Sequence, residues 1–432
     1  METLKRQIGF FGALAIGVGG TVGGGIYVLV GTAASRAGPA ALVSFAIAFV
    51  AAICIALPYA ELACRYPDAG GAYAFTKHVF GKRWAQVSGW NYWGAYIFVS
   101  AYVTIGFGGY LNALTGFPRL YSSLLLVLII TAINVIGIKT SGRIQMVLLA
   151  IALGTLLIYL VDGILHAHPR NLVPFMPNGI GGVLSASLVA FLAFGGFDMV
   201  ASAGEEVTDP ERNLPRAIIA TLLIVLVLYI SVTLAAITTF SWRGLGSSYS
   251  PLTSSAATFM GVYGVYLITI AAVVTTAATA SAVLVVTSRV SYAMARDSLL
   301  PSLLSATMGK EKSPYAAVLL NGILIGLISL TGSIDLAVAI GGFLYTMHFM
   351  FPLLSITKIK LCERKVSGIR KPAFQIPLPQ VLIPAAFVLS AILIISSGLL
   401  GIVLGSLWLL SGVLMGRMIG LKNPTNPEVL QL

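Results

Sequence analysis

Charged side chains are scarce in this sequence. Asp, Glu, Lys and Arg together make up 9% of its 432 residues, while 58% are hydrophobic. A soluble domain usually carries about 25% charged residues, so too few polar side chains are present to cover a water-facing surface. A disordered chain is excluded as well, because disorder goes with low hydrophobicity and high charge. The composition therefore indicates an all-α protein that crosses a membrane many times.

Cysteine and the usual enzyme motifs are also lacking. The chain has three cysteines, two of them in an apolar stretch, which excludes a disulfide framework. It contains no H-E-x-x-H, no G-x-S-x-G and no G-x-x-x-x-G-K-[ST]. Metalloprotease, serine hydrolase and ATP-driven pump readings thus lose their usual support. We expect no enzyme, no metal site and no organic cofactor.

Long apolar runs are what the chain has in abundance. A hydrocarbon core of about 30 Å needs about 20 largely apolar residues per helix. The sequence predicts twelve such spans, at 8–34, 39–64, 85–113, 120–138, 143–164, 182–205, 214–240, 255–295, 315–331, 335–357, 379–401 and 403–418. The eighth is too long for one span, so its first third is expected to be an external helix or loop. Only Gly398, Gly401 and Gly405 offer a turn between the last two spans.

The basic residues divide unevenly between the two sides of these spans. The net charge of +12 comes from 26 Lys and Arg against 14 Asp and Glu. Even-numbered connections and both tails hold 22 of the 26 basic residues, and the odd-numbered connections hold Arg36, Arg119, Arg170 and Arg243. Basic loops stay in the cytoplasm, so we expect both termini to be cytoplasmic. The protein itself is expected in the cell membrane. The positive charge needs no nucleic-acid partner.

Glycine is concentrated inside two of the predicted spans. The first span contains Gly17-Val18-Gly19-Gly20-Thr21-Val22-Gly23-Gly24-Gly25, and the sixth contains Ala193-Phe194-Gly195-Gly196-Phe197-Asp198. Each glycine costs about 1 kcal/mol relative to alanine in a helix. Close helix packing is the alternative explanation for such glycines. Paired interruptions at corresponding positions of two halves nevertheless indicate the midplane site of a transporter.

The physics of a broken helix suggests what such a site binds. The amino end of the second half-helix presents free N–H groups that favour an anion such as a carboxylate. The carboxyl end of the first half-helix presents carbonyls that favour an ammonium group or another cation. An α-amino acid carries both charges a few ångströms apart. Two adjacent breaks therefore predict a site for a zwitterion.

Several motifs, in order along the chain, are similar to one known family. The first span reads G-x-G-x-x-V-G-x-G-I-Y from Gly17 to Tyr27, and the second carries Tyr59-Ala60-Glu61-Leu62-Ala63 followed by Pro67-Asp68-Ala69-Gly70-Gly71-Ala72-Tyr73. Gly196-Phe197-Asp198, Glu205-Glu206 and Pro210-Glu211-Arg212 follow in the sixth span and its loop. Over most of its length the chain resembles the amino acid–polyamine–organocation superfamily of secondary transporters.

That resemblance implies a fold and a set of site residues. The fold would be a five-plus-five inverted repeat like that of the leucine transporter, with two helices outside it: repeats 1–165 and 182–357, extra helices within 379–418, and a cytoplasmic tail 419–432. Gly24 and Gly25, next to Gly23, would present N–H groups to the substrate carboxylate. The carbonyls of Thr21 and of Ala193–Gly195 would receive the amine, with Phe194 as a lid or wall. Relatives often have Ser or Ala at position 24, which suggests either a compact fit or tolerance of bulkier substrates.

Acidic residues inside the spans are candidates for coupling or gating. Asp198 lies beside the second break and is interpreted as a proton-coupling group, or as the N-cap of the following half-helix. Glu61 is expected to pair with a cytoplasmic arginine or to cap a backbone. Glu205, Glu206 and Arg212 form either a salt-bridged gate or a solvated loop. His348 is predicted to be a hydrogen-bonded packing residue.

The coupling ion remains open at this point. Many relatives place a lysine in the fifth span, where this chain has Ala152, so proton coupling through that position is in doubt. Na⁺ is an alternative, with carbonyls of Gly19 or Gly20 and hydroxyls of Thr279 or Ser281 as ligands. The hydroxyl-rich run around Thr279 is equally explained by helix packing.

The sequence predicts secondary transport of amino acids by alternating access, proton-coupled or by exchange. Neutral amino acids are favoured over cationic ones and polyamines, because Asp198 is the one acid placed deep enough to match a cationic side chain. A membrane sensor of the same fold is the alternative of a different class. The expected partners are a small-molecule substrate and the lipid bilayer.

Overall fold

The structure is a computed structural model that describes residues 8–66, 71–137, 142–202, 204–308, 313–365 and 372–418. The α-helices of these ranges are α1 (Phe10–Thr21), α2 (Gly24–Ala37), α3 (Ala41–Arg65), α4 (Ala72–Phe80), α5 (Lys82–Thr115), α6 (Arg119–Ile136), α7 (Gly142–Leu165), α8 (Gly179–Ala193), α9 (Met199–Ser202), α10 (Pro210–Thr239), α11 (Trp242–Ser247), α12 (Pro251–Phe259), α13 (Gly261–Arg296), α14 (Tyr315–Ser329), α15 (Ile334–Lys365), α16 (Pro379–Ile395) and α17 (Gly398–Met418). Short 3₁₀ turns occur at Gly38–Ala40, Pro169–Leu172, Gly204–Glu206 and Ser302–Ser305. The same ranges contain no β-strand, only the isolated bridges Ile8–Val207 and Met308–Ser313.

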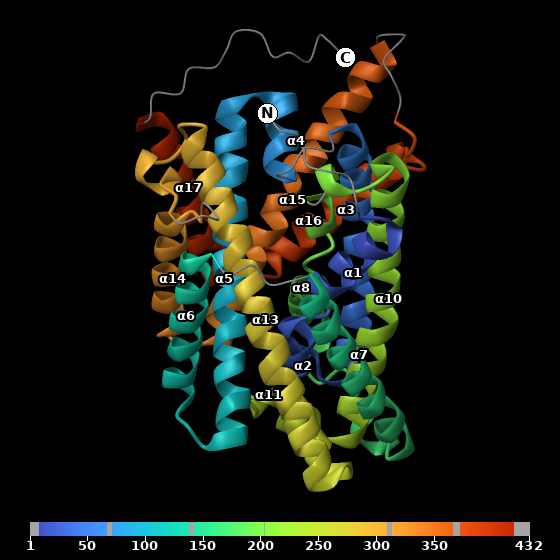
Figure 1. Ribbon diagram of the computed structural model, residues 1–432. Helices are drawn as coiled ribbons and strands as arrows, with labels where there is room; N and C mark the ends of the chain where they lie inside the picture. The colour runs from blue at the N-terminus through green and yellow to red at the C-terminus, as the bar shows by residue number, and fades with distance from the viewer. Residues whose placement is uncertain are drawn as a thin grey trace.

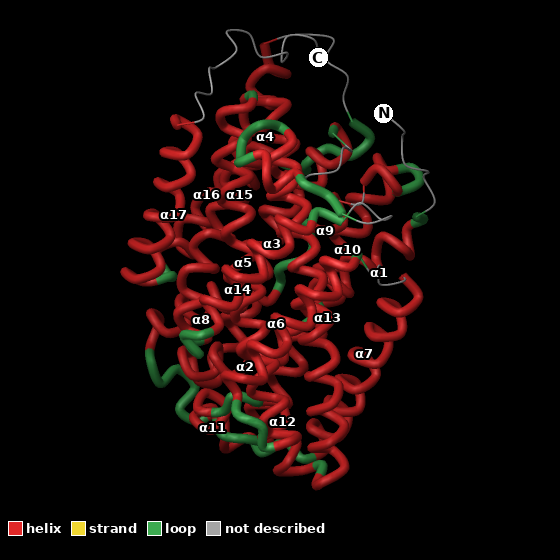
Figure 2. Tube along the Cα trace, turned by 60° about the vertical axis from the view of Figure 1, so that its left-hand side comes forward, coloured by secondary structure: helices red, strands yellow, loops and turns green. Residues whose placement is uncertain are grey.

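The molecule is a bundle of long helices. Helices α5, α10 and α13 run along most of its length, with α4 at one end and α11 at the other (Figure 1). Seen from another side, the loops gather mainly at the two ends of the bundle (Figure 2). A membrane helix satisfies its own backbone hydrogen bonds, which is why an apolar chain of this composition folds in this way.

Eight helical segments of the described chain are long and apolar enough to cross a membrane, by length and composition. One of them, Gly24–Arg65, has 42 residues and contains both α2 and α3, which meet where Gly38 has a φ of +63°. At 1.5 Å per residue its length is about 63 Å, twice the thickness of a hydrocarbon core. Four shorter apolar helices, α1, α8, α14 and α16, accompany the eight.

The helices lie where the sequence predicts apolar spans, and the two predicted interruptions are present. The first predicted span is divided into α1 and α2, with Val22 and Gly23 between them. The sixth is divided into α8 and α9, with residues 194–198 between them. The local cost of glycine in a helix thus located both breaks correctly.

Two predicted boundaries are shifted in the structure. A separate helix, α12, does precede the eighth span, but it ends at Phe259 and α13 is then continuous over 36 residues. The turn between the last two spans falls at Gly398, with a φ of +74°, whereas Gly401 and Gly405 lie inside α17. A side chain at Gly405 would overlap Phe343, so this glycine serves close helix packing.

The helices differ sharply in how far they are buried. In the most apolar stretch of each helix, 83% of the residues of α15 and 78% of those of α5 are buried, compared with 17% of those of α17. Exposed leucine, isoleucine and valine side chains cover α6, α7 and α17. The centre of the bundle is therefore built around α5, α15 and the interrupted helices. The division into repeats stays a prediction, and residues 419–432 lie outside the described residues.

Candidate substrate site at two helix breaks

The first break exposes the amino end of α2. Helix α1 ends at Thr21 and α2 begins at Gly24. The N–H of Gly23 turns back to the carbonyl of Thr21 at 2.8 Å, while the N–H of Gly24 donates to the hydroxyl of Thr279 on α13 at 2.9 Å. A side chain at Gly23 would overlap that threonine. One amide predicted to bind a carboxylate is thus already bonded to an oxygen.

The second break lies between α8 and α9. Helix α8 ends at Ala193, and Gly196 has a φ of +117°, which is accessible to glycine and strained for other residues. A Cβ at Gly196 would lie 2.5 Å from the carbonyl oxygen of Gly20, and one at Gly25 would lie 3.3 Å from the Cα of Ala193. The glycines therefore let the two breaks approach each other directly.

A buried tyrosine joins the two breaks. The hydroxyl of Tyr229 on α10 donates to the carbonyls of Thr21, at 2.6 Å, and Ala193, at 3.1 Å. These are the last residues of α1 and α8, whose carbonyls have no partner within their own helices. Phe194 is fully buried and packs its ring against Tyr229 and Phe45. It lies where a wall of the predicted site would be, and Gly195 beside it is partly exposed.

Position 24 is crowded. A Cβ at Gly24 would lie 2.8 Å from Val103 and 3.2 Å from Thr276. The space that relatives give to a serine or alanine side chain is filled here from α5 and α13. The glycine therefore does not enlarge the site in this conformation, which favours the compact fit over tolerance of bulkier substrates.

Asp198 is fully buried and is held by hydroxyl groups. Its carboxylate accepts hydrogen bonds from Tyr96 at 2.8 and 2.9 Å and from Tyr345 at 3.2 Å. The N–H of Gly196 donates to it at 3.3 Å. Asp198 directly precedes α9, as an N-cap would, but its carboxylate is bonded to these tyrosines and to an amide outside the helix. The carboxylate is thus buried among neutral donors, with no cation among these partners.

His348 does not behave as predicted. It is fully buried, as a packing residue should be, and its ring lies 4.4 Å from that of Tyr92, centroid to centroid. The predicted hydrogen bond is absent, however, because neither ring nitrogen has a partner. Nε2 lies 3.9 Å from the nearer carboxylate oxygen of Asp198. The prediction was wrong because pattern alone gave no neighbour on another helix.

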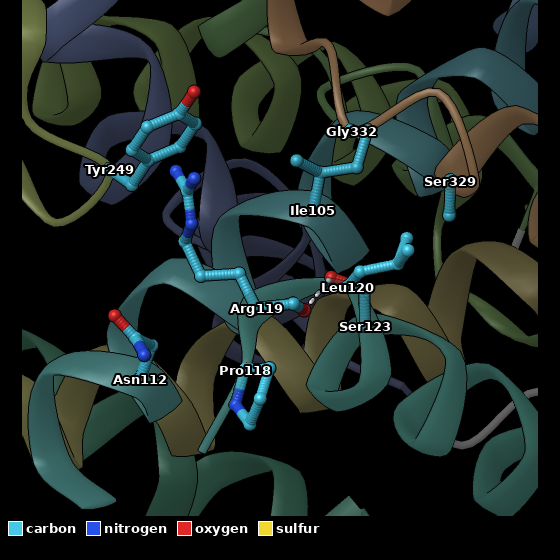
Figure 3. Close-up of a pocket in the computed structure, with 9 residues that line it drawn as sticks. All are labelled: Ile105, Asn112, Pro118, Arg119, Leu120, Ser123, Tyr249, Ser329 and Gly332. Atoms are coloured by element: carbon cyan, nitrogen blue, oxygen red, sulfur yellow. Dashed lines mark hydrogen bonds between the residues drawn. The ribbon is translucent and has the colours of Figure 1, made fainter. Parts of the chain in front are cut away.

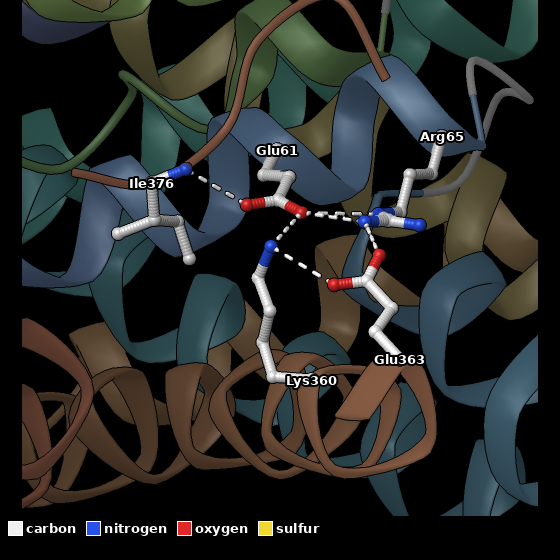
Figure 4. Close-up of polar contacts among 5 residues, drawn as sticks. All are labelled: Glu61, Arg65, Lys360, Glu363 and Ile376. Carbon is white, nitrogen blue, oxygen red and sulfur yellow. Dashed lines mark hydrogen bonds and ion pairs between the residues drawn. The ribbon is translucent and has the colours of Figure 1, made fainter. Parts of the chain in front are cut away.

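Glu61 is paired as predicted, and twice over. Its carboxylate accepts from Arg65 and Lys360, each at 2.7 Å, and from the backbone N–H of Ile376 at 2.8 Å (Figure 4). Glu363 also binds Arg65, and it binds Lys360 at 3.3 Å. This charged cluster connects α3, α15 and the segment before α16. It lies away from the breaks, toward the end of the bundle where α3 ends.

Two of the predicted gate residues, Glu206 and Arg212, are not paired with each other in this conformation. Glu206 and Arg212 are both exposed, and neither forms an ion pair with a described residue. The side chain of Glu205 lies outside the described residues. The arrangement of Glu206 and Arg212 matches the alternative of a solvated loop, and a role in gating stays a prediction.

The predicted Na⁺ ligands are only partly brought together. Gly20 faces the second break, since a Cβ there would lie 3.4 Å from the carbonyl of Gly196, whereas Gly19 is exposed. Thr279 lies at the first break, but Ser281 accepts from Asn134 on α6 at 3.3 Å. Residues two apart on a helix face different directions, so Thr279 and Ser281 do not share one site here.

A surface pocket of about 360 Å³ lies elsewhere, between α5, α6 and the loop that carries Tyr249 (Figure 3). The guanidinium of Arg119 stacks over the ring of Tyr249 at 3.5 Å from its centroid. The pocket contains none of the residues at the breaks. The breaks, by contrast, bring together backbone groups that have no partner within their own helices.

Sequence reasoning did not identify Tyr229, Tyr345 or Tyr96 as residues of the site. A single tyrosine in the apolar run Leu222–Ile230 was a usable signal, since a buried hydroxyl needs a partner. The partner itself lies 208 residues away in the sequence. Trp90 and Trp93, on α5 like Tyr96, pack against Trp408 on α17.

The fold and the paired breaks define a multi-pass membrane protein of the transporter class. Residues 8–417 match the family model described as amino acid permease, and the chain belongs to that family. This confirms the resemblance drawn from the motifs around Gly17–Tyr27 and Gly196–Asp198.

Individual relatives differ in what they carry. The chain is 33% identical to the branched-chain amino acid permease BcaP of Bacillus subtilis, over 96% of this chain and 93% of that protein. It is 31% identical to the methylthioribose transporter of the same organism, over 88% of this chain and 86% of the relative. It is 31% identical to the vacuolar cationic amino acid transporter 4 of Arabidopsis thaliana, over 74% of this chain and 58% of that longer protein.

Proposed function

We propose that this protein is a secondary transporter that carries amino acids across the cell membrane by alternating access. The observation that carries the proposal is the direct contact of two interrupted helices, in which Gly196 packs on Gly20 and Gly25 packs on Ala193. Interrupted helices that meet at one place are the usual construction of a transporter's substrate site. The amino acid permease family supports the same conclusion.

The two breaks offer complementary charges to a zwitterion. The N–H groups of Gly24 and Gly25 open α2 and would bind the substrate carboxylate, with Gly23 allowing the approach. The carbonyls of Thr21 and of Ala193–Gly195 would bind the ammonium group. Helix dipoles reinforce both interactions, since α2 begins and α1 and α8 end at this place.

Neutral amino acids fit this site better than cationic ones or polyamines. Asp198 could bind a cationic side chain, but three neutral donors already occupy its oxygens. Phe194 adds an apolar wall. The similarity to a branched-chain amino acid permease supports a neutral substrate. The similarity to cationic amino acid and methylthioribose transporters makes these the competing substrate classes.

Protons are the coupling ion that the surroundings of Asp198 favour. Tyr96, Tyr345 and the unbonded ring of His348 face this carboxylate, and no lysine or arginine does so among the described residues. Protonation would remove a buried charge and weaken the hydrogen bonds that Tyr96 and Tyr345 donate to Asp198, just before α9. A Na⁺ site at Gly19, Gly20 and Thr279 is the weaker alternative, because Ser281 faces α6. Exchange without a coupling ion is the second alternative.

The expected topology has twelve spans in a five-plus-five inverted repeat, with two additional helices and both termini in the cytoplasm. The positions of the helices support the count, with α1 plus α2 and α8 plus α9 each serving as one discontinuous span. Placing 22 of the 26 basic residues on one side supports the orientation. The poorly buried α16 and α17 match helices outside the repeat.

Counterflow in proteoliposomes tests the function. Vesicles loaded with one unlabelled amino acid should accumulate the same labelled amino acid from outside, for a panel of neutral, cationic and acidic substrates, with and without Na⁺ and a pH gradient. We expect saturable counterflow of neutral amino acids that responds to the pH gradient and not to Na⁺. Binding without counterflow would identify a sensor, and flux without saturation would identify a channel.

A further inference from the structure

Two side-chain hydroxyl groups already form hydrogen bonds with the backbone at the two breaks. We call the carbonyls of Thr21 and Ala193 the carbonyl pole and the N–H of Gly24 the amide pole. At the carbonyl pole, the Tyr229 hydroxyl is shared between Thr21 and Ala193 at 2.6 and 3.1 Å. At the amide pole, the Thr279 hydroxyl oxygen accepts the N–H of Gly24 at 2.9 Å. These are the backbone groups to which the proposed function assigns the ammonium and the carboxylate of the substrate.

Each hydroxyl is fixed in the orientation that its role requires. Tyr229 is fully buried, and its ring packs edge-on against Phe45 and tilted against Phe194. Thr279 donates its own proton to the carbonyl of Thr275 at 2.8 Å, which leaves an oxygen lone pair for Gly24. One hydroxyl therefore acts as a donor, as an ammonium does, and the other acts as an acceptor, as a carboxylate does.

The two hydroxyls come from helices that are not interrupted. Tyr229 lies in α10 and Thr279 in α13, and both helices are continuous through the level of the breaks. They approach the breaks from outside the segments that form them. Their contacts thus link the interrupted helices to continuous ones: the Tyr229 hydroxyl binds the ends of α1 and α8, and the Thr279 hydroxyl binds the start of α2.

We propose that Tyr229 and Thr279 are built-in surrogates for the substrate's ammonium and carboxylate, which stabilise the unloaded carrier while it changes its access. The inference rests on the proposed zwitterion site. Backbone groups of a broken helix that are buried without a partner are costly in a medium with no water. A loaded carrier satisfies them with the substrate, and an unloaded carrier satisfies them with these two hydroxyls.

The proposal separates two reactions that share one protein. Exchange of one substrate for another uses only the loaded carrier, whereas net uptake also requires the unloaded carrier to return. Removal of a surrogate hydroxyl should slow the return step and leave exchange intact. Loss of one buried hydrogen bond changes an equilibrium by about fivefold to tenfold, so we expect the ratio of exchange to net uptake to rise by about that factor.

The experiment compares Tyr229→Phe and Thr279→Val with the wild type, using labelled leucine in proteoliposomes. Net uptake is measured into vesicles that contain no amino acid, and exchange into vesicles loaded with leucine. Tyr110→Phe is the matched control, because Tyr110 is equally buried and its hydroxyl donates at 2.6 Å to a backbone carbonyl, that of Tyr27, which lies inside α2 and not at a helix end. Thr279→Ser restores the hydroxyl and should restore net uptake.

The expected result is a raised ratio in both variants, an unchanged ratio in Tyr110→Phe, and recovery in Thr279→Ser. A parallel fall of exchange and net uptake in both variants would overturn the proposal, since it indicates that the hydroxyls only maintain the site. An unchanged ratio would overturn it as well. Wild-type protein that exchanges no amino acid would instead contradict the proposed function. The thermal midpoint in detergent shows whether each variant is folded, and Thr279→Val decides the matter alone if Tyr229→Phe does not fold.

Discussion

Glu61 and Asp198 are both fully buried carboxylates, and the bundle holds them in opposite ways. Glu61 is neutralised by Arg65 and Lys360 and receives a backbone N–H besides. Asp198 receives hydrogen bonds from two tyrosines and one backbone amide, with no cation among them. A compensated charge fixes the helices that supply its partners. A charge stabilised by neutral donors can be removed by a single proton, without leaving an unpaired cation behind.

The position of the two carboxylates follows the same contrast. The cluster around Glu61 joins α3 to the end of α15, away from the breaks. Asp198 is part of the second break itself, and its partner Tyr345 lies one turn of α15 before His348. We therefore interpret Glu61 as a structural residue and Asp198 as a residue whose charge changes during transport.

The largest expected effect comes from breaking the compensated site. Glu61→Gln leaves Arg65 and Lys360 partly uncompensated at 6% and 15% side-chain exposure. Removing one partner of a buried ion pair typically costs about 3–5 kcal/mol, and the remaining Glu363 should hold the loss near the lower figure. A lower thermal midpoint in detergent measures it. Glu363→Gln, at a more exposed position, is the control and should lose less; equal stability of Glu61→Gln and wild type would contradict the structural interpretation.

The second effect separates charge from shape at the uncompensated site. Asp198→Asn keeps an acceptor for Tyr96 and Tyr345 but cannot change its charge. We expect uptake driven by a pH gradient to fall by about tenfold, the factor that a difference of about 1.4 kcal/mol represents, while substrate binding and the thermal midpoint are retained. Uptake at a series of external pH values measures this.

A second variant and one contradicting outcome complete that test. His348→Phe removes ring nitrogens that have no hydrogen bond, so we expect an unchanged thermal midpoint and a smaller change in the pH profile. If Asp198→Asn keeps the pH dependence of the wild type, the proton-coupling role is refuted.

The smallest effect calibrates the comparison at a carboxylate near the surface. Asp297, just after α13, accepts from Lys77 at 2.6 Å and Tyr73 at 2.5 Å. Partial burial acts to raise the pKa of Asp297, but the hydrogen bonds from Lys77 and Tyr73 and the nearby positive charges outweigh it, and the pKa is lowered. Stability from this group is therefore present above the ordinary Asp pKa of about 3.9 and is lost as the pH falls through the lower, folded-state value.

Asp297→Asn should cost about 0.2–1 kcal/mol at neutral pH, as exposed ion pairs do. As the pH is lowered, the thermal midpoint of this variant should also fall less than that of the wild type. Lys77→Met removes the cation and keeps the carboxylate, so it should shift the acid-induced decline to higher pH. A variant of Asp297 with an unchanged acid profile would show that the contact does not contribute.

Much of the fold was accessible from the sequence. Apolar length located the helices, and the glycines of Gly17–Gly25 and Gly195–Gly196 located both breaks, since these properties act within a few residues. Glu61 was correctly expected to pair, because a charge in an apolar span requires compensation. The helix before the eighth span ended at Phe259, earlier than expected, and the last turn formed at Gly398, one of three glycines that could equally have formed it.

The site was less accessible, because its polar contacts join distant segments. Tyr229 reaches Thr21 across 208 residues, and no local pattern distinguishes it from a tyrosine in a packing role. Ser281 and Thr279 share one hydroxyl-rich run, yet they face different helices. His348 was expected to have a hydrogen bond, and only its neighbours Tyr92 on α5 and Asp198 in the second break decide that it has none.

The sequence by itself determined that the chain is a helical membrane protein, where its helices are interrupted, and which family it belongs to. These follow from hydrophobicity, glycine content and motifs, all of which are local. The tertiary structure alone decided which hydroxyls satisfy the broken helices and which buried carboxylate has its charge compensated. Those depend on the packing of helices far apart in the sequence, where shifts of one residue turn a side chain to another neighbour.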